Sequence, residues 1–239
     1  LGDVYKRQAV QLKFGHSFVT GEDVSLRLWP AFFNTLKLTL VSSVVIILLS
    51  MLLGILTALF RGTWFDRVTR STAFVLTAIP SYWLAAILII FVSVKLNILP
   101  TSGLTGPESY ILPVLVITLG YTGIYFRNVR SAVIQQLDQD YVLYMRAMGV
   151  PTSKLLLYVA RNAMQVVVSI FCMSIPLILG GSVVIENVFA WPGMGQLSVK
   201  AVLEQDFPII QAYVLVVSVL FILFNTLADV INMLSLIHI

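Results

Sequence analysis

The chain has 239 residues, of which 59% are hydrophobic and only 11% are charged, whereas a soluble domain is about 45–50% apolar and about 25% charged. With a mean hydropathy of +0.95, this composition indicates a membrane protein, and a net charge of +4 is too small to suggest nucleic-acid binding. The only cysteine is Cys172, and the two histidines, His16 and His238, lie near opposite ends, which argues against disulfides, metal centres and histidine-based catalysis.

The two ends of the chain differ from the sequence between them. The chain begins with Leu1 rather than Met, and the opening letters LGDVYKRQ and closing letters LSLIHI resemble translated cloning adaptors. We therefore expect residues 1–11 and 235–239 to be non-native and residues 12–234 to form the domain, with native ends as the alternative.

Five windows without Asp, Glu, Lys or Arg suggest membrane spans, because crossing a hydrocarbon core of about 30 Å takes about 20 mostly apolar helical residues. They cover residues 38–60, 71–94, 110–126, 162–185 and 207–228. From them we predict spans at about 34–60, 71–94, 110–132, 162–185 and 207–233. The fold class expected is all-α, a polytopic transmembrane helical bundle.

Positive charges alternate between the connecting segments. Residues 61–70 and 127–161 together carry eight Lys and Arg side chains, whereas residues 95–109 and 186–206 together carry two. Because cytoplasmic loops are enriched in Lys and Arg, the first pair of segments is expected to be cytoplasmic and the second pair external.

Prolines and glycines interrupt the predicted spans. Pro80 and Pro176 remove backbone hydrogen bonds, and small residues let helices approach closely. The glycines concerned are Gly120, Gly123, Gly180 and Gly181. We expect these positions to kink or pack helices, and ordinary membrane packing is favoured over a direct part in a solute path.

The external segment 186–206 contains the letters WPGMG. Pro192, Gly193 and Gly195 permit a tight reversal, while Trp191 suits the membrane interface. We predict a structured external cap at this stretch, with a simple loop as the alternative.

The cytoplasmic segment 127–161 is too long for a turn, and its residues 133–161 predict two short helices. The first carries apolar side chains at i, i+3, i+4 and i+7: Tyr141, Tyr144, Met145 and Met148. Asp138 and Asp140 suit its start, Gly149 suits its end, and a second helix is expected from about Pro151 to Arg161. Such a unit suits docking in a partner's groove, although periodicity alone equally favours a helix pair lying on lipid.

The letters DYVLYMRAMGVPTSKLLLYVARNA in this segment resemble the cytoplasmic EAA loop of permease subunits in bacterial ABC importers. Five other stretches resemble the dipeptide, oligopeptide and nickel branch of that superfamily: GGSVVIENVFAWPGMGQL, the following DFPIIQAYVLVVSVLFILFNTLADVIN, FGHSFVTGEDV, IPSYWLA and ILPTSG. The resemblance extends from about residue 12 to residue 232.

This resemblance implies a type I importer in the bacterial inner membrane. Its expected partners are a second homologous permease subunit, two cytoplasmic ATP-binding subunits and an external solute-binding protein. Six spans per permease are implied, so the first would be missing here. The resemblance and the apolar stripe together assign ATPase coupling to Asp140, Tyr141, Tyr144, Met145, Arg146, Ala147 and Gly149. The solute stays open among dipeptides, oligopeptides, nickel chelates and related small molecules.

Three features depart from the family pattern. Leu143, Tyr144 and Met145 replace the small residues typical of the EAA motif, so docking is expected to differ in detail. The proline usual after the letters RNA is absent, which predicts a straighter entry into the next helix. The letters LSLIHI stand where the family has a cytoplasmic tail, and we ascribe this to truncation.

Other functional classes have weaker support in the sequence. A GxxxxGK[ST] phosphate loop is absent, so we expect a pore subunit that is not an enzyme, with ATP hydrolysed by a partner. An ion- or proton-coupled secondary carrier is the main alternative, but it needs an ionisable residue at membrane depth. The nearest is Asp229, at the expected cytoplasmic end of the last span. An intramembrane hydrolase would need a serine-histidine, aspartate-pair or HExxH arrangement within the spans, and the sequence has none there.

Overall fold

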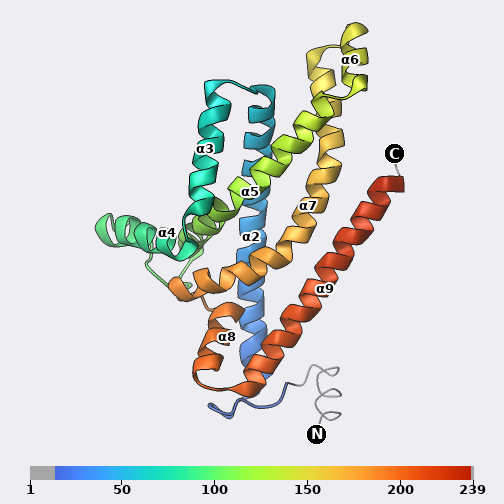
Figure 1. Cartoon of the computed structure of the whole chain (residues 1–239). Helices are drawn as coiled ribbons and strands as arrows, with labels where there is room; N and C mark the ends of the chain where they lie inside the picture. The colour runs from blue at the N-terminus through green and yellow to red at the C-terminus, as the bar shows by residue number, and fades with distance from the viewer. Residues whose placement is uncertain (1–13, 238–239) are drawn as a thin grey trace. The chain divides into compact units, whose positions relative to one another are not determined.

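The computed structural model describes residues 14–237, except the side chains of residues 165, 166, 169, 170, 172–174, 232 and 234–237. The predicted residues 1–11 and the last two residues of 235–239 lie outside this range. Within it the regular elements are helical (Figure 1), which confirms the all-α class. They are α2 (Val24–Leu59), α3 (Trp64–Ala78), α4 (Ser81–Leu88), the π-helical η1 (Ile89–Lys95), the short η2 (Pro107–Tyr110), α5 (Ile111–Leu137), α6 (Asp140–Ala147), α7 (Thr152–Val188), α8 (Met194–Leu203) and α9 (Phe207–Ile237).

Three stretches of described helix are long and apolar enough to cross a membrane: Val24–Leu59, Pro107–Leu137 and Phe207–Ile231. A fourth is added if Trp64–Ala78 and Ser81–Lys95 are counted as one broken span. The span predicted at 162–185 lies inside α7, where several side chains are not described. The five-span arrangement therefore stays a prediction.

Pro80 lies at a break between helices instead of kinking one helix. Ile79, which caps α3, has extended backbone angles (φ −78°, ψ 126°), as expected for a residue that precedes proline. The chain then starts again as α4 at Ser81. Pro176, in contrast, lies within α7, as the sequence predicted.

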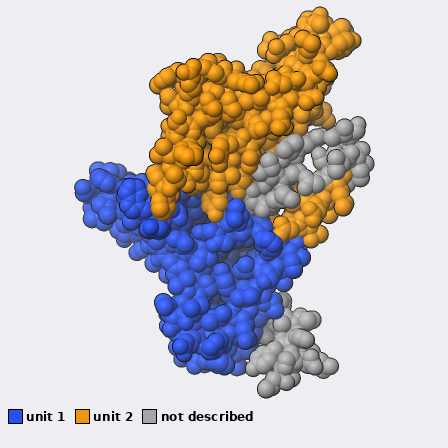
Figure 2. All heavy atoms as spheres, viewed as in Figure 1, with its two compact units in different colours: residues 1–42, 81–117, 176–223 blue, residues 43–80, 118–175, 224–239 orange. Residues whose placement is uncertain are grey.

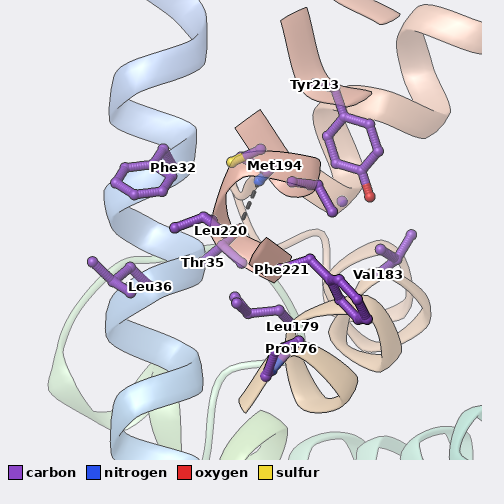
Figure 3. A pocket seen from close by; sticks show the side chains of 12 residues that line it. Phe32, Thr35, Leu36, Pro176, Leu179, Val183, Met194, Tyr213, Leu220 and Phe221 are labelled. Carbon is purple, nitrogen blue, oxygen red and sulfur yellow. Dashed lines mark hydrogen bonds between the residues drawn. The ribbon is translucent and has the colours of Figure 1, made fainter. Parts of the chain in front are cut away.

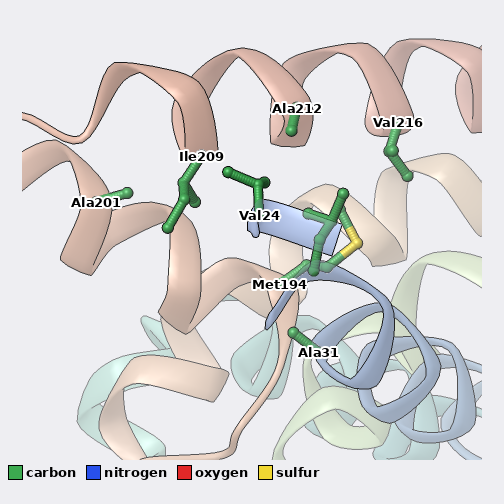
Figure 4. Packing of buried hydrophobic residues seen from close by; sticks show 8 residues of the cluster. Val24, Ala31, Met194, Ala201, Ile209, Ala212 and Val216 are labelled. Carbon is green, nitrogen blue, oxygen red and sulfur yellow. The ribbon is translucent and has the colours of Figure 1, made fainter. Parts of the chain in front are cut away.

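The helices contribute to two compact units, coloured separately in Figure 2. Unit 1 contains Leu1–Ser42, Ser81–Ile117 and Pro176–Leu223, and unit 2 contains Ser43–Pro80, Thr118–Ile175 and Phe224–Ile239. In unit 1, apolar side chains from the start of α2, from α8 and from the start of α9 form one buried cluster (Figure 4). Its members are Val24, Leu28, Ala31, Met194, Ala201, Ile209, Ala212 and Val216. This cluster packs α8 against the first turns of α2 and α9.

In unit 2, glycine allows close packing of helices at two places. A β-carbon on Gly123 would lie 2.6 Å from the Ala73 carbonyl oxygen, and one on Gly54 would lie 2.6 Å from Val129. Gly123 thus has the predicted packing role, and Gly54 is a further case. Around Gly120 and Gly180 no described atom outside their own helix lies within 4 Å of the added carbon. The expected close helix contacts at these two positions are therefore not made within the described chain.

Candidate functional site

The predicted coupling segment forms a helix, a sharp break and a second helix. Asp140 lies in the first turn of α6, after the N-cap Gln139. At the other end, the Gly149 N–H donates to Arg146 O (3.0 Å) and the Val150 N–H donates to Met145 O (3.0 Å). These two bonds are those of a Schellman motif. Gly149 has φ +73°, a left-handed conformation that glycine adopts without steric cost.

The side chains of α6 divide between packing and exposure. Val142 is buried, Tyr141 and Met145 are half-buried, and Tyr144 and Met148 are each 66% exposed. Arg146, Ala147 and Gly149 are also exposed. The stripe predicted for docking is therefore partly used for packing within unit 2, and its outer residues remain at the surface.

The second helix of this segment does not end at Arg161. α7 runs without interruption from Thr152 to Val188, so the helix predicted to be cytoplasmic and the next predicted span are one element. A proline after the letters RNA would have removed an interior hydrogen bond. Its absence here permits a continuous helix, in agreement with the straighter entry expected from the sequence.

A buried carboxylate in unit 2 was not identified from the sequence. Asp66, on the first turn of α3, is 1% exposed. It accepts two hydrogen bonds from Arg130 of α5, from Nε at 2.9 Å and from Nη2 at 3.0 Å. It also accepts one from the Gly62 N–H at 3.1 Å, and Arg70 lies 3.3 Å away. Removing one partner of such a pair is costly, because it leaves the other charge without its counter-ion.

The predicted external cap begins where α7 ends. The Trp191 N–H donates to Glu186 O (2.8 Å) and the Ala190 N–H donates to Asn187 O (3.3 Å), so this helix end repeats the Schellman bonds of α6. Its left-handed residue is Ala190, with φ +46°. The prediction that Trp191 anchors at the membrane interface is wrong. Trp191 is fully buried, with its ring 4.6 Å from that of Tyr110 and its Nε1 donating to Asn34 O at 3.3 Å.

A second buried carboxylate, Glu186, organises the cap. It accepts hydrogen bonds from Thr35 Oγ1 (2.8 Å) and Ser182 Oγ (3.2 Å). It also accepts them from the N–H groups of Gly195 (2.7 Å) and Gln196 (3.3 Å). Glu186 is fully buried, and buried polar groups need such partners. The carboxylate therefore satisfies donors in the first turn of α8 and joins that turn to α2 and α7.

The cap glycines are required by the space around them. A β-carbon on Gly193 would clash with Glu186 Oε2 and would lie 2.5 Å from Thr35 Oγ1, and one on Gly195 would lie 2.6 Å from Val183 Cα. Pro192 is exposed, and its carbonyl accepts from Asn34 Nδ2 at 2.9 Å. The cap is thus a packed structure. Gly180 and Gly181, which precede it on α7, lie at or partly at the surface.

A small cavity of about 30 Å³ lies beside the cap, among side chains of α2, α7, α8 and α9 (Figure 3). Pro176 and Leu179 lie on its α7 side, and Phe32 and Leu36 on its α2 side. The Met194 N–H donates to Thr35 Oγ1 at 2.8 Å in its wall. A volume near that of one water molecule is too small for a solute.

Sequence reasoning missed Glu186 and Thr35, although it selected the glycines beside them. The available signal was a lone acidic residue directly after the uncharged window 162–185, followed by a glycine-containing turn. Such a residue is costly to bury unless the fold gives it several donors.

Comparison with known proteins agrees with this architecture. The family model described as the binding-protein-dependent transport system inner membrane component matches residues 50–235. The chain is 67% identical over 225 residues to the metal-staphylopine import system permease protein CntB of Staphylococcus aureus (strain NCTC 8325 / PS 47), covering 94% of this chain and 72% of that protein. It is 37% identical over 227 residues to the glutathione transport system permease protein GsiC of Escherichia coli (strain K12), covering 95% and 74%.

Solved structures share the fold. Inward-facing MetNI, a methionine ABC transporter, superposes with a TM-score of 0.74 at 19% identity, covering 88% of this chain and 96% of that chain. An amino acid ABC transporter solved with histidines superposes with a TM-score of 0.68 at 15% identity, covering 85% and 91%. The chain belongs to the family of inner membrane components of binding-protein-dependent transport systems, and it is a multi-pass permease subunit of an ABC importer.

Proposed function

We propose that this permease subunit carries a small metal chelate, of the metal-staphylopine type, across the bacterial inner membrane. The observation that supports this most directly is the 67% identity over 94% of the chain to the permease of a metal-staphylopine import system. In this function the metal is cargo, enclosed by its chelating ligand.

Glutathione is the second candidate solute. It rests on the 37% identity to a glutathione permease, a much weaker likeness over almost the same part of the chain. Dipeptides and oligopeptides, which the sequence resemblance left open, come after both.

The proposed assembly contains this subunit, a homologous permease partner, two cytoplasmic ATP-binding subunits and an external binding protein. This chain supplies part of the pore, and its partners hydrolyse ATP. Coupling occurs at the segment from Asp140 to Gly149, because Tyr144 and Met148 present exposed apolar surface beside Arg146 on a short helix. Helices with this pattern dock into grooves of partner proteins.

An uptake experiment tests the solute. Cells that lack their own metallophore importers would express the complete system and receive ⁶³Ni²⁺ with or without staphylopine, or ³⁵S-glutathione. We expect ATP-dependent accumulation of ⁶³Ni only when staphylopine is present. Accumulation of glutathione without accumulation of the nickel chelate would reject the proposed cargo.

A labelling experiment tests the topology on which the coupling proposal depends. A cysteine at position 153, in a Cys172→Ser background, should resist a membrane-impermeant maleimide in intact cells and react after permeabilisation. A cysteine at position 199, in the predicted external segment, is the control and should react in intact cells. Labelling of position 153 from outside would contradict the assignment of this segment to ATPase contact.

A further inference from the structure

A groove of about 560 Å³ lies along α8 and the first turns of α2, within unit 1. It is separate from the small cavity of Figure 3. The groove falls in the range typical of small-molecule sites, about 300–1,000 Å³. Its polar and charged lining residues are Arg27, Asn34, Asn187, Gln196 and Lys200. Its lining thus contains two cationic side chains and three carboxamides, and no acidic side chain.

Arg27 is the unusual member of this set. Its Nη1 atom is buried and has no hydrogen-bond partner within the described part of the chain. A guanidinium group normally presents five N–H donors to carboxylate or phosphate oxygens in a fixed planar geometry. A buried donor without an acceptor carries a cost, and an anion in the groove would remove that cost once the guanidinium turned to present this nitrogen to it.

The backbone N–H groups at the start of α8 are not available to bind an anion in the groove. The N–H groups of Met194, Gly195 and Gln196 already donate to Thr35 and Glu186. The attraction of this groove for an anion must therefore come from the side chains of Arg27 and Lys200. Lys200 has Glu204 3.8 Å away, but its side chain is 60% exposed, so it can turn toward a bound solute.

We propose that this groove receives the carboxylate groups of the transported solute at the outer side of the permease, with Arg27 as the main contact and Lys200 as the second. The inference rests on the proposed import function and on the external location predicted for residues 186–206. Neutral amide groups at Asn34, Asn187 and Gln196 are suited to the remaining polar atoms of a chelate or peptide-like ligand, and Leu26, Leu197 and Leu203 supply apolar walls.

Direct binding to the complete transporter tests the proposal. The complex would be held in one state with a non-hydrolysable ATP analogue, without binding protein, and titrated with ⁶³Ni-staphylopine by equilibrium dialysis. We expect Arg27→Gln to weaken binding about tenfold, since one charged hydrogen-bond partner is lost. Arg27→Lys should weaken it less, Lys200→Gln should have a smaller effect than Arg27→Gln, and added salt should weaken wild-type binding.

Lys95→Gln is the matched control, because Lys95 is also expected on the external side but does not line the groove. Its ammonium lies over the Phe91 ring instead, 4.6 Å from the centroid. Affinity in this variant should equal that of the wild type. Equal affinities in Arg27→Gln and Lys95→Gln would overturn the proposal.

Two further measurements separate the possible explanations. If Arg27→Gln weakens docking of the ligand-free binding protein to the complex, the groove is a protein contact and the proposal is rejected. If the wild type binds ³⁵S-glutathione but not the nickel chelate, with the same dependence on Arg27, the carboxylate site is supported while the proposed metal cargo is rejected.

Discussion

The C-terminal ends of α6 and α7 have the same backbone hydrogen bonds but different means of stabilising them. At the end of α6 the left-handed residue is Gly149, and no described atom would lie within 4 Å of a β-carbon there. At the end of α7 the left-handed residue is Ala190, followed directly by the buried Trp191. A non-glycine residue in this conformation costs about 1–2 kcal/mol.

The difference shows two ways of specifying a turn. The turn at Gly149 follows from the local sequence, because a glycine at this position adopts the left-handed conformation without help from tertiary contacts. The turn at Ala190 is imposed by tertiary contacts, since Trp191, Glu186 and the cap glycines would lose their packing in any other conformation. Under the proposed coupling role the first turn moves with a docked partner, whereas the second is expected to stay fixed with the cap.

Gly195→Ala should lower stability the most, because the added methyl group would clash with the tertiary contacts of the cap. The new methyl group would lie 2.6 Å from Val183 Cα, a backbone atom that cannot rotate away. Overpacking of this kind costs about 3 kcal/mol. We expect a fall of several degrees in the apparent melting temperature of the detergent-purified transporter and loss of assembled complex.

Gly180→Ala is the control for this substitution, since it lies on α7 with open space around it. It should leave the melting temperature unchanged or raise it slightly, because alanine favours helix more than glycine does. Equal melting temperatures for the two variants would mean that the cap is not tightly packed.

Glu186→Gln should have the next largest effect. The amide group would place N–H donors where Glu186 now accepts from Gly195 and Gln196, or from Thr35 and Ser182. Leaving buried donors without acceptors costs about 1–3 kcal/mol. A lower melting temperature is expected, while Glu204→Gln, at an exposed position after α8, should match the wild type. If both variants have the melting temperature of the wild type, the carboxylate does not stabilise the cap.

The same distinction explains what could be predicted from the sequence. The helix and the break at 140–149 were predicted closely because the stripe, the acidic first turn and Gly149 are local signals. The glycines of the cap were selected because glycine and proline mark turns wherever they occur. The burial of Trp191 was not predicted, since it depends on Tyr110 and Asn34, which are distant along the chain.

The buried carboxylates Asp66 and Glu186 were missed for a related reason. Each carboxylate accepts a hydrogen bond from a side chain on another helix: Asp66 from Arg130, and Glu186 from Thr35. A sequence window contains only one side of such a pair. The sequence predicted an interruption at Pro80 but did not show that one helix would end and another begin there, because a proline in an apolar run is compatible with a kink and with a complete helix stop.

Gly149→Ala is expected to have a smaller effect on stability but a measurable effect on coupling. The β-carbon meets open space, so the cost is that of the left-handed conformation alone, about 1 kcal/mol. The subunit should still insert, while solute-stimulated ATP hydrolysis and uptake fall, and Gly149→Val should lower both further. Gly149→Asn is the control, because asparagine tolerates this conformation. Wild-type ATP hydrolysis and uptake in the valine variant would show that this turn is not part of the coupling element.

Ala190→Gly should produce the smallest effect, and in the opposite direction. Glycine removes the left-handed penalty of about 1–2 kcal/mol, but it also gives the unfolded chain more freedom, which offsets about 0.4–1 kcal/mol. Ala190 is exposed, so little packing is lost. The apparent melting temperature should rise by a degree or two, and Gln205→Gly, at the left-handed residue that ends α8 with φ +57°, should behave similarly. A fall in melting temperature for Ala190→Gly would mean that the alanine methyl group contributes to the cap, and that the turn at α7 is not held by Trp191 and Glu186 against a local preference.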